Sequence, residues 1–181
     1  MTHAEQTVDR NRCYLLLLLF LSSFLLLGLA GCSGSNAPDT ASSTVTARQA
    51  IIATRGVEVM PFDLEQTTHI FEKLEDGGLQ QVIADDPADE EQIRLIRTHL
   101  AEEAERFQQG DFHDPAMIHG EDMDGLHELM LGAERITIAY SELANGAQIL
   151  YTTEDAELVA AIHAWFDAQV SDHGSHAVDH P

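Results

Sequence analysis

Apolar and polar positions alternate over two pairs of short segments, one pair in each half of the chain. In the first pair the alternation covers residues 68–72 and 79–84, separated by the turn residues Asp76-Gly77-Gly78. In the second pair it covers residues 135–140 and 147–152, separated by Asn145-Gly146, a dipeptide that favours a tight hairpin. Alternation with a period of two is typical of a half-buried strand, so each pair predicts a β-hairpin.

A helical pattern follows each predicted hairpin. After the first, Asp86 is suited to the N-cap and Pro87 to the first helical position, and Gly110 ends the pattern. After the second, Thr152 and Asp155 have the spacing of a capping box. The apolar positions at helical spacing are Ile93, Ile96, Leu100, Ala104 and Phe107 in the first helix, and Leu158, Val159, Ile162, Trp165, Phe166 and Val170 in the second.

These patterns predict an α+β fold built from two ββα units, residues 67–110 and 135–171. Neither unit can bury its apolar face alone, which favours packing them as one antiparallel sheet covered by the helices. A short helix over about residues 121–131 would connect the units, and a short strand over residues 57–60 could extend an edge. The helices match at an offset of 66 residues, which fits either a duplication or two separate uses of a common unit.

The first 31 residues have the features of a secretory signal peptide. Arg10 and Arg12 precede an almost purely apolar run, residues 14–29, which at about 16 residues is short for a membrane-spanning helix. The run ends in Leu29-Ala30-Gly31-Cys32, which resembles the lipobox of bacterial lipoproteins. The resemblance implies cleavage before Cys32, lipid attachment to its thiol, and a membrane as the partner of the mature chain.

A lipid on Cys32 predicts a location in the bacterial envelope, and Ser33, in place of an Asp, favours the outer membrane over the inner membrane. Residues 32–54 are predicted to form the lipidated end and a flexible tether, followed by the folded domain over residues 55–171. Residues 172–181 are predicted to be a polar tail that contains histidine. Because Cys13 leaves with the signal and Cys32 carries lipid, no disulfide is expected in the domain.

The net charge is strongly negative. The chain has 31 acidic and 9 basic side chains, and removal of Glu5, Asp9, Arg10 and Arg12 with the signal leaves the balance at −22. Such a surface repels nucleic acid and anionic lipid headgroups, so no nucleic-acid partner is expected. An acidic surface is also typical of adaptation to salt, so the charge alone does not indicate a binding site.

One stretch combines histidine and methionine, whose imidazole and thioether groups are suitable copper ligands; imidazole also suits zinc. On the predicted connecting helix, Met123, His127 and Met130 lie at i, i+4 and i+7 and therefore share a face. His113 and His119 precede this helix and could fold over that face. The two methionines equally fit an apolar core stripe, so a copper or zinc site and a core stripe remain alternatives.

The remaining histidines indicate no site by their spacing. His69, His99 and His163 each lie beside apolar positions, which is typical of residues at the boundary of a core. The tail histidines, such as His173 and His176, fit either loose metal binding or a solvated segment. No nucleophile elbow, phosphate-binding loop or dinucleotide motif occurs in the chain, so no catalytic residue and no organic cofactor are predicted.

A second resemblance covers residues 60–174. Met60-Pro61-Phe62-Asp63-Leu64, Gly110-Asp111-Phe112 and Ala164-Trp165-Phe166-Asp167-Ala168-Gln169 resemble segments of small exported bacterial proteins that are sometimes labelled aspartate carbamoyltransferase. The Ser-Thr-Arg-Thr and His-Pro-x-Gln segments that bind carbamoyl phosphate in that enzyme are absent from the chain, so the label does not fit. The leading hypothesis is a lipid-anchored, non-catalytic binding or assembly domain. Metal handling is the alternative, and an enzyme with an unrecognised site is the third hypothesis.

Overall fold

The computed structural model describes residues 40–179. The predicted signal peptide, the lipidation site Cys32 and the first residues of the predicted tether lie outside the described residues. Within residues 40–179, no helix is both long enough and apolar enough to cross a membrane.

The predicted α+β fold and both predicted hairpins are confirmed. The strands are β1 (Thr67–Leu74), β2 (Gly77–Ala84), β3 (Thr137–Leu143), β4 (Gly146–Thr152) and β5 (Ala177–Asp179). They form one sheet in the order β3-β4-β2-β1-β5. The two hairpins join through antiparallel pairing of β2 with β4, which sets Leu79 opposite Leu150. The sheet therefore has one strand more than the four that the hairpin pattern predicts.

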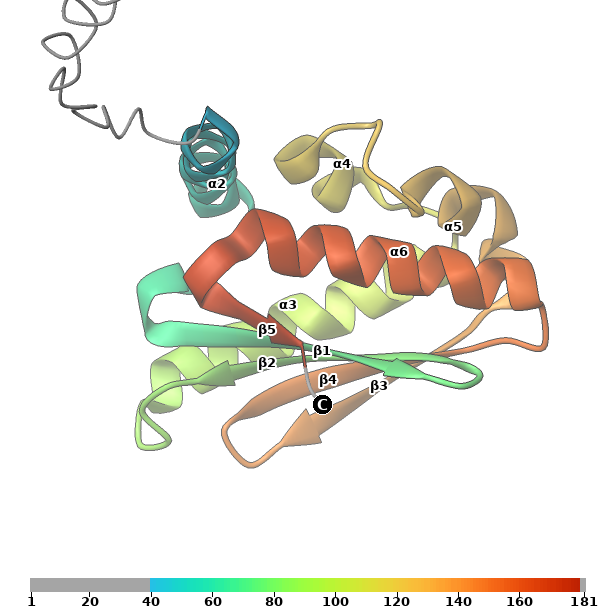
Figure 1. Cartoon of the computed structure of the whole chain (residues 1–181). Coiled ribbons are helices and arrows are strands. Elements are labelled where there is room, and N and C mark those ends of the chain that lie inside the picture. Colours follow the sequence, from blue (N-terminus) through green and yellow to red (C-terminus); the bar gives the residue numbers. More distant parts are fainter. Residues whose placement is uncertain (1–39, 180–181) are drawn as a thin grey trace, which may run out of the picture. The chain divides into compact units, whose positions relative to one another are not determined.

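Two long helices, α3 (Glu90–Gln108) and α6 (Ala156–His173), cover one face of this sheet (Figure 1). Both were predicted, but α3 begins later than expected. Asp89 caps it by accepting a hydrogen bond from the Gln92 backbone N–H, whereas the Asp86 carboxylate accepts the Ala88 N–H. Asp86 therefore forms a turn ahead of the helix, as Asp side chains commonly do. Asp155 caps α6 through the Glu157 N–H.

Two short helices replace the single connecting helix predicted over about residues 121–131. They are α4 (His113–His119) and α5 (Leu126–Gly132). Gly120 and Gly125 both have positive φ, 101° and 77°, which interrupts helical backbone. A Cβ at Gly125 would collide with the Ala161 carbonyl oxygen of α6, so this turn also requires glycine for its close approach.

The prediction of a flexible tether over residues 32–54 is wrong for its second half. Helix α2 (Thr40–Val59) occupies that part of the chain and packs against α4 and α6 (Figure 1). Ile52 is only 1% exposed, and Arg55 donates a hydrogen bond to the Ile118 carbonyl oxygen. The predicted strand over residues 57–60 is also wrong, because this helix extends through Val59.

The prediction of a polar tail over residues 172–181 is wrong for residues 172–179, which form regular structure. Helix α6 continues to His173, a 3-10 turn covers Gly174–His176, and β5 pairs in parallel with β1. Ala177 is buried and lies opposite His69 in this pairing. The segment is ordered because it completes the sheet edge that β1 would otherwise leave unpaired. Shorter 3-10 turns lie at Leu64–Gln66 and Ala133–Arg135.

Candidate functional site

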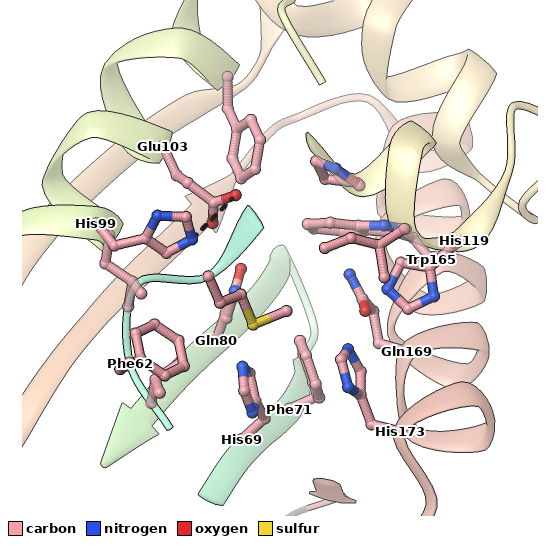
Figure 2. Close-up of a pocket in the computed structure, with 16 residues that line it drawn as sticks. Phe62, His69, Phe71, Gln80, His99, Glu103, His119, Trp165, Gln169 and His173 are labelled. Carbon is pink, nitrogen blue, oxygen red and sulfur yellow. Dashed lines mark ion pairs between the residues drawn. The ribbon is translucent and has the colours of Figure 1, made fainter. Parts of the chain in front are cut away.

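The core contains a small cavity of about 30 Å³ between the sheet, α3, α4 and α6. A cavity of this size holds one or two water molecules. Four histidines line it, one from each of four elements: His69 of β1, His99 of α3, His119 of α4 and His173 of α6. Figure 2 shows their rings around the cavity together with Gln80, Glu103, Trp165 and Gln169, and Met60 also lines it.

Three polar atoms at this cavity have no hydrogen-bond partner. They are His69 Nδ1, Trp165 Nε1 and Gln169 Oε1, and they are the only such fully buried side-chain atoms within residues 40–179. All three residues line the same cavity. An unsatisfied buried donor or acceptor costs about 1–3 kcal/mol, and native proteins rarely leave one without a water or ligand. A water molecule or a polar ligand in this cavity would supply the partners that these atoms lack.

Three of the imidazole rings form a contiguous group. The ring of His173 stacks on that of His69, with centroids 5.0 Å apart and planes 11° from parallel. The ring of His119 meets His173 edge-on, also at 5.0 Å between centroids. His173 therefore lies between the other two rings.

Two charged residues hold the orientation of His119. Its Nδ1 lies 2.8 Å from Asp172 Oδ2, so the ring donates its Nδ1 proton to this carboxylate. Arg48 of α2 pairs with both oxygens of Asp172 and also donates to the His119 carbonyl oxygen at 3.2 Å. Burial alone would raise the pKa of Asp172, but the hydrogen bonds from His119 and Arg48 outweigh it and lower this pKa to about 2. This hydrogen bond occupies Nδ1, so Nε2 is the ring nitrogen of His119 that carries the lone pair in the neutral form.

Burial favours the neutral form of two of the cavity histidines, His69 and His173. Burial is the largest cause that lowers the pKa of His69, to about 4, with a smaller contribution from His99. Burial, together with repulsion from His69 and His119, places the pKa of His173 well below its ordinary value. Neutral imidazole carries one nitrogen lone pair, so these rings can accept a hydrogen bond or bind a metal ion.

Glu103 and His99 form a second pair on the opposite wall, with Nε2 and Oε1 3.7 Å apart (Figure 2). Burial raises the pKa of Glu103 to about 8, helped by Asp114 and opposed by Arg106. Burial also lowers the pKa of His99. Both groups are therefore mainly uncharged at neutral pH, and the pair is a contact between neutral groups rather than an ion pair.

The five residues predicted as metal ligands are dispersed. His119 lines the cavity and Met123 is buried in the core, whereas His113, His127 and Met130 are exposed. The predicted shared face is wrong, because Met123 lies in the turn before α5 rather than on a helix with the other two. No three His, Cys, Asp or Glu side chains within residues 40–179 are positioned as a ready metal site.

Sequence reasoning missed the remaining cavity histidines as a group. His69 and His173 are more than 100 positions apart, and no spacing rule connects them. One signal was present: in β1, His69 alternates in phase with Phe71, which faces the core. That phase predicts a buried imidazole but does not identify its neighbours.

Comparison with known proteins finds no protein family that matches the chain, and no significant match among curated proteins or solved structures. The resemblances to bacterial lipoproteins and to small exported proteins therefore stay predictions.

Proposed function

We propose that this chain is a lipid-anchored protein of the bacterial envelope whose domain acts by binding a small ligand in the histidine cavity. The observation that carries the proposal is the convergence of His69 Nδ1, Trp165 Nε1 and Gln169 Oε1, all buried and without partners, on one cavity. A domain without a ligand there retains the full desolvation cost of three polar atoms. A bound ligand removes that cost.

The lining of the cavity favours binding over covalent catalysis. None of its 16 residues is Ser, Thr, Cys, Lys or Tyr, the side chains that most often act as nucleophiles. The three side chains with unpartnered atoms are held by regular elements, His69 by β1 and both Trp165 and Gln169 by α6. Rigid, preorganised groups bind a ligand without a large loss of conformational entropy.

The membrane anchor rests on the Leu29-Ala30-Gly31-Cys32 sequence. We expect Cys32→Ser to remove the lipid, because serine lacks the thiol that forms the thioether, and to move the protein from the membrane to the soluble fraction. Cell fractionation with mass measurement of the intact chain tests this. Cys13→Ser, which changes the other cysteine, should leave both mass and fractionation of the mature protein unchanged. An unaltered membrane association of Cys32→Ser would refute the anchor.

Native mass spectrometry tests binding in the cavity. The full-length protein would be extracted in mild detergent from the bacteria that produce it, with no histidine tag. We expect a retained non-covalent mass on the wild type and a lower occupancy of it in Gln169→Leu, which replaces a side chain whose buried Oε1 has no partner with an apolar side chain of similar size. Removing an unsatisfied polar group should leave stability equal or higher.

Gln148→Leu is the matched control for this experiment. Gln148 lies on β4 outside the cavity and pairs with Gln81 through a 2.8 Å hydrogen bond. This variant should keep the bound mass. A wild type that carries no extra mass, or a Gln169→Leu protein that carries the same mass at the same occupancy as wild type, would overturn the proposed function.

A further inference from the structure

The size of the cavity limits what it can hold. Pockets for organic ligands typically measure about 300–1,000 Å³. This cavity, at about 30 Å³, is an order of magnitude smaller. Without a rearrangement of the core, it admits a single ion with a water molecule, but not an organic compound.

The unpartnered atoms favour a cation over an anion. A hydrogen bond with the backbone of His176 favours a proton on the His69 ring, and the buried Nδ1 atom has no partner. His69 therefore presents a lone pair at Nδ1, and Gln169 Oε1 is also an acceptor. Of the three unpartnered atoms, only Trp165 Nε1 is a donor. The net charge of −22 also raises the local concentration of cations.

The types of donor atom select the class of cation. Imidazole nitrogen, with the thioether of Met60 also lining the cavity, suits zinc and copper, whereas Ca²⁺ and Mg²⁺ prefer carboxylate and carbonyl oxygen. Metal-binding histidines almost always donate their other ring N–H to a carboxylate or a backbone carbonyl. His119 meets this pattern through Asp172, and His69 meets it at the backbone of His176.

We propose that the cavity binds one transition-metal ion, zinc or copper, through His69 Nδ1 and His119 Nε2, with His173 as the third ligand. This inference rests on the proposed function and names its ligand. Asp172 is a positioning residue that acts through His119. A water on the ion would accept the Trp165 N–H and donate to Gln169 Oε1, which satisfies the remaining unpartnered atoms.

His173 must turn to complete the site. Its ring is nearly parallel to that of His69, and lone pairs in parallel stacked planes cannot both point at one ion. The same residue also lines a groove of about 240 Å³ beside α2, together with Gln49 and His176. The His173 side chain therefore lies between this groove and the histidine cavity. One side-chain rotation both opens a path for the ion and brings the third nitrogen to it.

Co²⁺ and Zn²⁺ titration of the full-length protein tests the inference. The protein, extracted in detergent without a histidine tag and stripped with a chelator, would be titrated with Co²⁺, followed by its visible absorption, and then with Zn²⁺ as competitor. We expect one equivalent of Co²⁺ with the intense bands of a low-coordinate site, displaced by one equivalent of Zn²⁺. Mg²⁺ should neither bind nor compete.

Four variants locate the site. His69→Phe and His119→Phe should abolish stoichiometric binding, and Asp172→Asn should weaken it by about 10–100-fold, as losses of a supporting carboxylate do. His127→Ala removes an exposed imidazole on α5 and should bind like the wild type. Circular dichroism in chelator shows whether each variant folds. If His69→Phe or His119→Phe does not fold, the metal affinities of the wild type and Asp172→Asn still test the inference.

The possible results distinguish a failure of the proposed metal site from a failure of the proposed binding function. Absence of stoichiometric Co²⁺ and Zn²⁺ binding to the wild type overturns the inference. So does binding that is unchanged in folded His69→Phe, or unchanged in Asp172→Asn, or lost in His127→Ala. A retained non-metal mass in native mass spectrometry without Co²⁺ or Zn²⁺ binding overturns the metal site and leaves the binding function standing. No bound mass and no metal overturn both.

Discussion

Glu103→Gln is expected to stabilise the metal-free protein by about 3–5 kcal/mol at pH 8 and by only about 1 kcal/mol at pH 5. Glu103 is 7% exposed, and burial raises its pKa to about 8. In the unfolded chain the carboxyl ionises near its ordinary pKa of about 4.3. Between these values the unfolded chain releases a proton that the folded protein retains. The contribution of Glu103 to the free energy of unfolding is therefore fully present below about pH 4 and is lost progressively as pH rises to 8.

The measurement is the free energy of unfolding by urea at pH 5 and pH 8, in the presence of a chelator. Gln is neutral at both pH values and has nearly the shape of protonated Glu, so the variant should not share the wild-type loss. Glu102→Gln is the matched control, because Glu102 precedes Glu103 on α3 and is exposed. Its stability should follow the wild-type profile. If the free energy of unfolding changes with pH in the same way for the wild type and Glu103→Gln, burial does not raise the pKa of Glu103 and the prediction is wrong.

Trp165→Ala is expected to lower the free energy of unfolding by about 3–5 kcal/mol. Trp165 is 0% exposed and lies at the centre of an aromatic cluster. Its ring meets those of Phe107, Phe112 and Tyr151 edge-on, with centroids 5.7–6.1 Å apart. Truncation removes these contacts and leaves a void that the surrounding helix and sheet cannot close.

Trp165→Phe separates packing from the loss of the indole N–H. It keeps an aromatic ring and removes a donor that has no partner in the metal-free protein, so its cost should be less than half that of Trp165→Ala. Because Trp165 is the only tryptophan, unfolding would be followed by circular dichroism rather than by fluorescence. An alanine variant as stable as the phenylalanine variant would contradict the packing argument.

Local patterns in the sequence determined the hairpins, the two long helices and the α+β class. Alternation and helical spacing depend on residues within a few positions of each other, and Asn145-Gly146 forms its turn whatever surrounds it. The predicted cap of α3 is wrong by three residues, because local spacing does not distinguish two Asp residues that can both cap. In the structure Asp89 caps the helix and Asp86 forms the preceding turn.

Two elements were invisible in the sequence because their order comes from distant contacts. The first residues of helix α2 are rich in Ser and Thr, which predicts a tether, yet Ile52 and Arg48 anchor the helix to the domain. The final strand contains only three residues, and it forms because β1 offers an unpaired edge. Neither contact can be inferred from neighbouring residues, since each joins segments more than 60 positions apart.

By itself, the sequence determined the local elements, the acidic charge and the prediction of a lipid on Cys32. Only the tertiary structure decided which histidines meet. His119 was among the predicted ligands, but His69 and His173 were expected at a core boundary and in a tail. The length of α6 places His173 on the ring of His69, and the hydrogen bond between His119 and Asp172 joins α4 to the same end of α6. Helical spacing can predict only side chains that share one element, whereas this site draws one ring from each of three elements.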